Sequence, residues 1–252
     1  MNSLIDSPFA VLLVTFVVLS GAAYLADGPL RRWRPIRKDE RVDFDTALAA
    51  TLTLLGLIIG FSFSMAMSRY DQRKNCEAAE ATAIATEYRR ADLLPGDDAT
   101  RARKLLGDYT NQRIKFFQEH PIGALGVDFA KLQDELWSVV VLGANARPNR
   151  TTTDLAVSGM DDVLNSQGCT QAAWLNRIPG AAWALLGLIA IFANILMGYR
   201  ERSTGMFALL ALPAVVSISF FLLADIDSPS GGGVIHIAPY NLISVSQSMA
   251  GH

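Results

Sequence analysis

Four long apolar runs constrain this chain more than any other feature. They cover residues 8–26, 47–67, 179–197 and 206–224. Each has about 20 residues, which is the length of helix that crosses the hydrocarbon core of a bilayer. Helices are expected because every backbone polar group inside a membrane must be hydrogen-bonded within the protein. The sequence therefore predicts an all-α integral membrane protein with four transmembrane helices.

The composition agrees with a membrane protein and argues against one class of partner. Hydrophobic residues make up 51% of the chain and charged residues only 18%, whereas a soluble domain carries about 25% charged residues. The net charge of -2 provides no basic field that would attract nucleic acid. We expect the lipid bilayer to surround the protein, and we expect no nucleic-acid partner.

The short loop between the first two apolar runs is strongly basic, which predicts the orientation in the membrane. Lys and Arg close to transmembrane helices stay on the cytoplasmic side. The first run is preceded by Asp6 and by no basic residue, so it is expected to be a retained span and not a signal peptide. We predict a bacterial inner-membrane protein with both termini outside the cytoplasm. The basic residues of this loop are Arg31, Arg32, Arg34, Arg37, Lys38 and Arg41.

This orientation predicts four parts of the chain. Residues 1–67 hold the first two transmembrane helices and the basic loop, and residues 68–177 form a helical extracytoplasmic, hence periplasmic, module. Residues 178–226 hold the last two transmembrane helices, and residues 227–252 form an extracytoplasmic tail. These boundaries follow from the apolar runs and their flanking charges.

Helical spacing of apolar residues predicts that the module consists of helices. The helix of the second span is expected to continue to about residue 94, where Pro95 and Gly96 stop it. Further helices are expected over residues 97–119, 128–144 and 152–165. Breaks are expected at residues 120–123 and 147–149, which contain proline.

The only two cysteines, Cys76 and Cys169, both fall in the predicted module, close to its two ends. An oxidising compartment allows such a pair to close. The sequence predicts a disulfide that ties the base of the module together. Two unpaired buried thiols, which behave as small apolar residues, are the alternative.

The second span carries small or polar residues at steps of three and four, so that they share one face of a helix. Close helix–helix packing explains such a stripe, and a wet pathway in an oligomer is the sharper hypothesis, with Phe61 as a narrow apolar constriction. The candidate pore-lining residues are Thr53, Gly56, Gly60, Phe61, Ser64 and Ser68.

Charged residues follow the outer end of the second span. Arg69, Asp71, Arg73 and Glu80 are candidates for a charged vestibule that biases ion selectivity. Local ion pairing along the helix is the alternative for the first three. Glu80 lies among alanines, which favours either a tight helix contact with an arginine such as Arg113 or a solvated helix face.

The remaining motifs carry little chemistry. Asp225 and Asp227, beside a glycine-rich turn, are a weak candidate for Ca²⁺ ligation, and a helix end followed by a turn is the default interpretation. His120, His236 and His252 show no ligand spacing and form no catalytic set with a serine and an acid. We expect no enzyme, no cofactor and no other metal site.

Part of the sequence resembles a known family. The segment 54–66, Leu-Leu-Gly-Leu-Ile-Ile-Gly-Phe-Ser-Phe-Ser-Met-Ala, its charged continuation to Pro95, and Asp225-x-Asp227-x-Pro229 resemble bestrophin-like bacterial membrane proteins. The resemblance implies four spans with a helical domain between the second and the third. Bestrophins are pentameric anion channels gated by Ca²⁺, so the resemblance also implies a channel.

Two functions remain open at this stage. The first is a homo-oligomeric channel or pore for small ions, with the second span lining the pathway. The second is a non-conducting membrane scaffold or sensor whose extracytoplasmic module binds an envelope partner. The spans carry no acidic or basic residue at their centres, which argues against ion-coupled transport.

Overall fold

The computed structural model describes residues 7–33, 41–119, 126–146, 150–200, 206–228 and 233–251. Within these ranges every regular element is a helix, so the predicted all-α class is confirmed. Most of the basic loop, the breaks at residues 120–123 and 147–149, and Pro229 lie outside the described residues.

The chain forms two compact units. The first unit combines Met1–Tyr70 with Arg177–His236, and we call it the membrane unit. The second unit combines Asp71–Asn176 with Ile237–His252, and we call it the module from here on. Helix α4 (Arg41–Arg90) contributes residues to both units.

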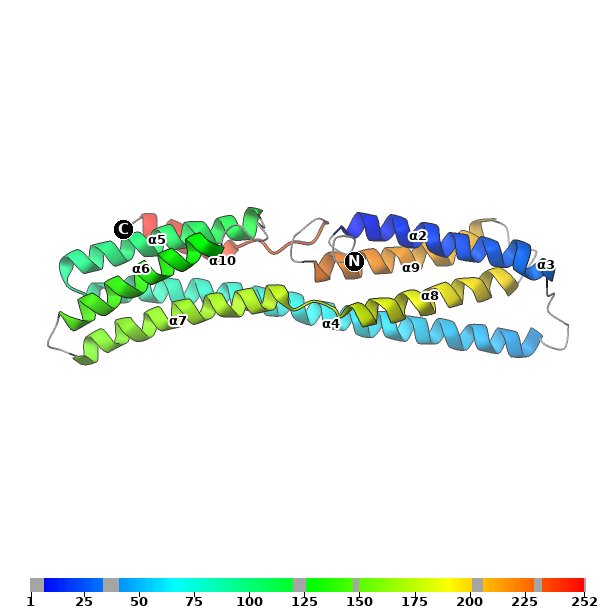
Figure 1. The fold of residues 1–252 in the computed structure, drawn as a ribbon, viewed down its shortest axis with the longest axis horizontal. Helices are drawn as coiled ribbons and strands as arrows, with labels where there is room; N and C mark the ends of the chain where they lie inside the picture. The colour runs from blue at the N-terminus through cyan, green and yellow to red at the C-terminus, as the bar shows by residue number, and fades with distance from the viewer. Residues whose placement is uncertain are drawn as a thin grey trace. The chain divides into compact units, whose positions relative to one another are not determined.

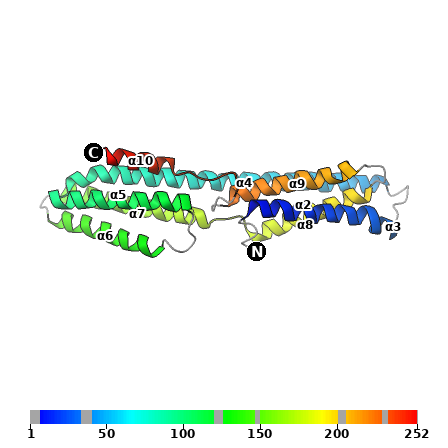
Figure 2. The same cartoon turned by 90° about the horizontal axis from the view of Figure 1, so that it is seen from above.

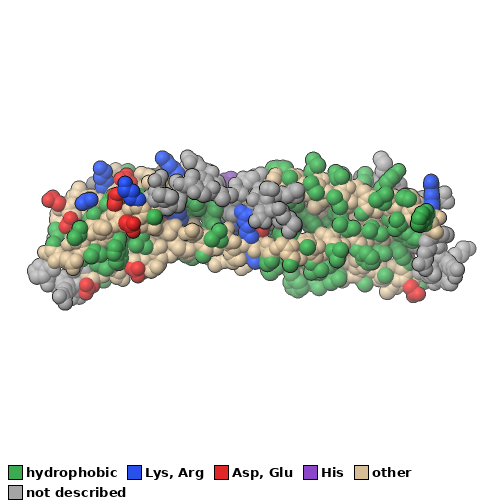
Figure 3. Space-filling model, viewed as in Figure 1, with side chains coloured by type: hydrophobic (Ala, Val, Ile, Leu, Met, Phe, Trp, Pro, Cys, Tyr) green, Lys and Arg blue, Asp and Glu red, His purple; other side chains and the backbone are tan. Residues whose placement is uncertain are grey.

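The membrane unit contains the helices expected from the apolar runs. Among the described residues, four helical stretches are long and apolar enough to cross a membrane, so the four predicted transmembrane helices are confirmed. The space-filling view shows mainly hydrophobic side chains over α2, α8 and α9 (Figure 3), as lipid contact requires. Besides the first part of α4, the elements are α2 (Pro8–Leu25), the π-turn η1 (Ala26–Leu30), α3 (Arg31–Trp33), α8 (Gly180–Arg200) and α9 (Met206–Asp227).

The core of the membrane unit lies between α2, α8 and α9, which pack along one another (Figure 1). The rings of Phe9 and Phe221 join α2 to α9 with their centroids 5.2 Å apart. Helix α4 contributes Leu55 and Ala66 to the same core. Near the start of α4, the Asp45 carboxylate forms an ion pair with the guanidinium of Arg200 on α8, with Oδ1 and Nε 2.8 Å apart.

Helices α2 and α8 approach most closely at Gly198. A β-carbon at this position would overlap the backbone of Ala23, including its carbonyl oxygen. A glycine is required here because two helix backbones meet with no space for a side chain. This contact fixes the register of α8 against α2.

The module is built from helices whose starts match the sequence pattern. Pro95 follows the short 3₁₀ turn η2 (Ala91–Leu93), and α5 (Gly96–Glu119) begins directly after it. Helix α6 (Gly126–Asn145) is close to its predicted range. Helix α7 (Arg150–Leu175) ends ten residues later than expected because its last turns pack on the module core through Thr170 and Ala173.

The tail contains a helix that the sequence analysis did not predict. Helix α10 (Tyr240–Ala250) lies beside α5 (Figure 2). Its Leu242 is fully buried. The helix has only 11 residues, and helices this short are marginal in water by themselves, so packing on the module stabilises it.

We predict that Gly198→Ala destabilises the membrane unit. The new methyl group meets the rigid backbone of Ala23, and overpacking of this kind costs about 1–3 kcal/mol. The measurement is the unfolding of the purified protein in detergent, followed by circular dichroism. The matched control is Gly187→Ala in the same helix, where an added β-carbon meets no atom within 4 Å. Equal stability of the two variants would contradict the assigned contact.

Candidate functional site

Helix α4 has one packed face and one open face in the membrane unit. Leu48, Leu55, Ser62 and Ala66 are buried at steps of four and seven, which place them on one side of the helix. The opposite side carries the predicted pore-lining residues, and all of them are exposed in the single chain. They are Thr53, Gly56, Gly60, Phe61, Ser64 and Ser68.

The two glycines of this face have open space where a side chain would lie, as far as the described residues extend. A β-carbon added at Gly56 or Gly60 would meet no atom within 4 Å. Close helix packing within the chain therefore does not explain the small residues, in contrast to Gly198. Packing between chains and an open pathway both remain compatible with this face. Its role as a pore lining stays a prediction.

Large side chains interrupt the open face. Phe61 is 63% exposed in the single chain, and Phe63, Met65 and Met67 are also exposed. The Thr53 hydroxyl donates to the carbonyl of Ala49 at 2.9 Å, so its proton is used within the helix and its oxygen still accepts. Apolar rings beside hydroxyl oxygens form a surface that can narrow a pathway and still contact ions.

The charged residues after the second span fall into separate environments. Asp71 is exposed, as a vestibule residue requires. Arg69 is partly buried and lies 3.6 Å from the Asp227 carboxylate at the end of α9. Arg73 is only 1% exposed and belongs to the interior of the module. Of these three, Asp71 alone combines charge with an open position on α4.

Glu80 is a buried residue of the module interior, which corrects its assignment to an exposed vestibule. It is fully buried and pairs with Arg113 of α5, whose Nη2 donates to Oε2 at 2.8 Å, while the Arg113 Nε donates to Oε1. The hydroxyl of Thr170 on α7 donates to Oε2 at 2.8 Å. The contact with Arg113 that the alanine-rich surroundings indicated is therefore present, and a solvated face is wrong.

Aromatic rings surround the Arg113 side of this pair. The guanidinium carbon lies 4.9 Å from the ring centroid of Phe116 and 5.4 Å from that of Phe129 on α6. A cation over aromatic faces is attracted by the ring quadrupoles, most strongly where water is excluded. The buried charge of Arg113 is thus balanced by a carboxylate on one side and by rings on the other.

Tyr109 completes the cluster as a neutral hydrogen-bond donor. Burial, together with the nearby Glu80 carboxylate, raises the pKa of the Tyr109 hydroxyl well above its usual value. The hydroxyl donates to Glu80 Oε1 at 3.4 Å. The carboxylate of Glu80 therefore receives donors from two further helices, α5 and α7, as a buried anion requires.

The two cysteines form a disulfide that joins α4 to α7. Cys76 and Cys169 are bonded with their Cα atoms 5.8 Å apart, so the predicted pairing is confirmed. The bond lies next to the Glu80 cluster, because Thr170 follows Cys169 directly and Glu80 is one turn beyond Cys76. The disulfide and the hydrogen bond from Thr170 to Glu80 hold α4 and α7 together at one level, and the ion pair with Arg113 joins α5 to α4 at the same place.

The carboxylates of Asp225 and Asp227 are engaged by backbone amides, which corrects their assignment as Ca²⁺ ligands. Both are 1% exposed. Asp225 accepts from the backbone N–H groups of Val234 and Ile235 at 2.9–3.1 Å. Asp227 accepts from the N–H of Ile178 at 3.1 Å. Their role is to end α9 and to hold the following turn, as the default interpretation stated.

Gly233 permits the Asp225 contact. A β-carbon at Gly233 would overlap the Asp225 carboxylate. The aspartate can therefore reach the next two amides only because the turn lacks a side chain at this position.

Side chains of α4 hold both ends of α10. The Glu77 carboxylate accepts from the Leu242 N–H at 3.0 Å and from the Asn241 amide at 2.6 Å. Pro239 offers no side-chain cap at the start of α10, so Glu77 satisfies donors that the first turn leaves free. The Tyr88 hydroxyl donates to the Met249 carbonyl at 3.4 Å. This role of Glu77 was not predicted from the sequence, in which only the apolar neighbours of Glu77 on α4 indicate burial.

Comparisons with known proteins agree with this architecture. The model of a family described as Bestrophin-like domain matches residues 14–235. A bacterial bestrophin homolog from Klebsiella pneumoniae has a similar structure, with a TM-score of 0.66 at 14% identity over 96% of this chain and 96% of that chain. A single-site variant of this homolog gives a TM-score of 0.67 at 13% identity over 96% and 99%.

A further structure, described as a membrane protein, gives a TM-score of 0.68 at 13% identity over 95% of this chain and 99% of that chain. At these identities the likeness shows the fold. No curated protein sequence matches the chain.

We predict that Glu80→Ala strongly destabilises the module. The substitution leaves the buried Arg113 charge without its carboxylate, which costs about 3–5 kcal/mol. The matched control is Asp92→Ala, which breaks the exposed pair between Asp92 and Arg103 and costs at most about 1 kcal/mol. Chemical unfolding in detergent, followed by circular dichroism, separates the two. Comparable losses from both variants would show that burial of the pair has no energetic consequence.

Proposed function

The chain belongs to the Bestrophin-like family, and on that premise we propose that it forms a homo-oligomeric membrane channel for small ions in which α4 lines the pathway. Family membership supports a membrane ion channel at the level of the family. The observation that carries the finer proposal is the open face of α4. This face holds small and polar residues along the whole second span, opposite the packed face.

An oligomer gives this face a physical purpose. Hydroxyls and glycines facing lipid gain little, because lipid provides no hydrogen-bond partner and glycine buries little apolar area. Around a central axis the same residues contact water and ions, and the exposed ring of Phe61 forms an apolar constriction. Thr53, Gly60 and Ser64 are the residues we assign to the lining.

Asp71 places one negative charge per chain at the mouth of the proposed pathway. Arg69 is held at the Asp227 carboxylate, while Arg73 and Glu80 are buried. Asp71 is therefore the group we assign to charge selection at the mouth. Repeated around an oligomer, it forms a ring that attracts cations and repels anions.

We also propose that the module and both termini lie on the periplasmic side of a bacterial inner membrane. The basic loop supports a cytoplasmic position for the connection between α2 and α4. The disulfide between Cys76 and Cys169 supports an oxidising compartment for the module, because cytosolic reductants keep thiols reduced. The two arguments are independent, since one rests on charge and the other on redox chemistry.

We predict that Gly60→Leu abolishes or strongly reduces ion flux without unfolding the protein. The added side chain enters open space in the single chain, so it obstructs only a pathway or a contact between chains. The measurement is single-channel recording of the purified protein in planar bilayers. Reversal potentials under salt gradients then give the ion selectivity.

The control for this experiment is Leu188→Phe on α8. Leu188 is also exposed, but it lies on another helix, outside the proposed lining. It should conduct like the unmodified protein. Unchanged currents with Gly60→Leu argue against the assigned lining, and silence from the folded, oligomeric, unmodified protein favours the scaffold or sensor hypothesis.

We predict that a membrane-impermeant thiol reagent labels Asp134→Cys in intact cells and leaves Asp43→Cys unlabelled. Asp134 is exposed on the module, and Asp43 is exposed near the start of α4. The native cysteines are bonded to each other and do not react. Detergent-permeabilised cells, in which both variants must react, provide the control. The reverse pattern in intact cells would overturn the proposed orientation.

A further inference from the structure

One of the three buried glutamates of α4 in the module accepts no hydrogen bond from the described residues, in contrast to the other two. Glu87 of α4 is 1% exposed, and neither of its carboxylate oxygens has a hydrogen-bond partner among the described residues. Glu77 and Glu80 on the same helix each accept at least two hydrogen bonds. Burial without hydrogen-bond donors favours the neutral, protonated carboxyl group over the carboxylate anion.

The backbone of α7 lies directly against this carboxyl group. A β-carbon at Gly159 would overlap Glu87 Oε2 and would also crowd the Arg90 guanidinium. Arg90 does not neutralise Glu87 by hydrogen bonding, because its Nη1 donates to the Leu155 carbonyl on α7 at 3.1 Å. The carboxyl group therefore fills the interface between two helices without an ionic partner bonded to it.

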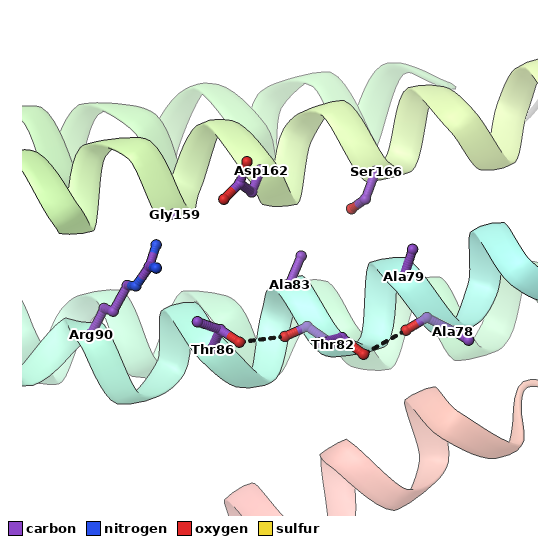
Figure 4. A pocket seen from close by; sticks show the side chains of 9 residues that line it. All are labelled: Ala78, Ala79, Thr82, Ala83, Thr86, Arg90, Gly159, Asp162 and Ser166. Atoms are coloured by element: carbon purple, nitrogen blue, oxygen red, sulfur yellow. Dashed lines mark hydrogen bonds between the residues drawn. The ribbon is translucent and has the colours of Figure 1, made fainter.

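A groove runs along the same interface and brings water close to it. It has a volume of about 530 Å³ and is lined by small residues of α4 and by Gly159, Asp162 and Ser166 of α7. Figure 4 shows Arg90 reaching from α4 toward Gly159, with Asp162 and Ser166 on the facing helix. Its lining on α4 includes Ala79 and Ala83, whose short side chains leave the space between the two helices open.

We propose that Glu87 makes the contact between α4 and α7 a proton-dependent switch of the module. With the proton bound, the neutral carboxyl group packs against Gly159 and the groove stays narrow. When the proton leaves, the carboxylate must gain water or donors, and α7 moves away from α4 at Gly159 to admit them. The disulfide between Cys76 and Cys169 holds the same two helices farther along, so the movement is confined to the part that contains Glu87.

The electrostatic surroundings place this switch close to neutral pH. Burial raises the pKa of Glu87 from 4.5 to about 8, with Arg90 lowering it and Asp162 on α7 raising it. Arg90 and Asp162 are the charged groups that act on the carboxyl group from the two helices. Glu87 belongs to the module and lies about 30 Å along the helix beyond residue 67, where the apolar run ends.

The direction of the pH effect follows from linkage. The unfolded chain releases the Glu87 proton near pH 4.5 and the folded chain near pH 8. The stabilising effect of the bound proton is fully present below pH 4.5 and is lost as the pH rises through 8. Glu87→Gln keeps a neutral side chain of the same shape at every pH, so it removes this dependence.

The first test compares unfolding of the full-length protein in detergent between about pH 5 and about pH 9. We expect Glu87→Gln to raise the unfolding midpoint by at least about 3 °C at the alkaline end and to have little effect at the acidic end. The matched control is Glu135→Gln on α6, an exposed carboxylate, which keeps the unmodified pH profile. Parallel profiles for Glu87→Gln and the unmodified protein would overturn the proposal.

The second test measures the movement itself. Spin labels on Arg89→Cys and Asp161→Cys, both exposed positions, report the distance between α4 and α7 while the native cysteines stay bonded. We expect the distance to increase with pH around a midpoint near 8, and we expect no change in the Glu87→Gln background. A constant distance in the otherwise unmodified protein, or the same increase with Gln at this position, would overturn the switch.

Discussion

The module depends on one buried carboxylate, that of Glu80. Three helices meet at this group, because α4 provides it, α5 provides Arg113 and Tyr109, and α7 provides Thr170. A buried ion is costly unless its charge is balanced and its lone pairs accept hydrogen bonds. Each helix must therefore keep its rotation and register for the anion to remain satisfied. The adjacent disulfide holds α4 and α7 in the register that the anion requires.

The same residue type has three different roles on the inner face of α4. Glu77, Glu80 and Glu87 are all buried, yet each meets a different surface. Glu77 meets the free amides at the start of α10, and Glu80 meets Arg113. Glu87 meets the bare backbone at Gly159. The first two environments provide hydrogen-bond donors for the carboxylate oxygens, whereas the third provides none, and burial there raises the pKa of Glu87.

Glycines on the helices of this chain lie in two kinds of environment, one closely packed and one open. Gly198 and Gly159 are needed because a neighbouring backbone or carboxyl group occupies the space of a side chain. A β-carbon added at Gly56 or Gly60 meets no described atom within 4 Å, although the four-residue spacing of these glycines is typical of a packing motif. The proposal of a pathway along α4 rests on this difference between occupied and open glycines.

The sequence by itself determined the four transmembrane helices, the helical class of the module and the break at Pro95, because hydrophobic length and backbone chemistry act locally. It also indicated the pairing of Cys76 with Cys169 and the partner of Glu80. Only the tertiary structure decided that Glu80 is buried, that Asp225 and Asp227 bind backbone amides, and that residues 240–250 form a helix. Each of these depends on which groups of distant segments approach a side chain. That approach sets burial and hydrogen bonding, and no local pattern of residues encodes it.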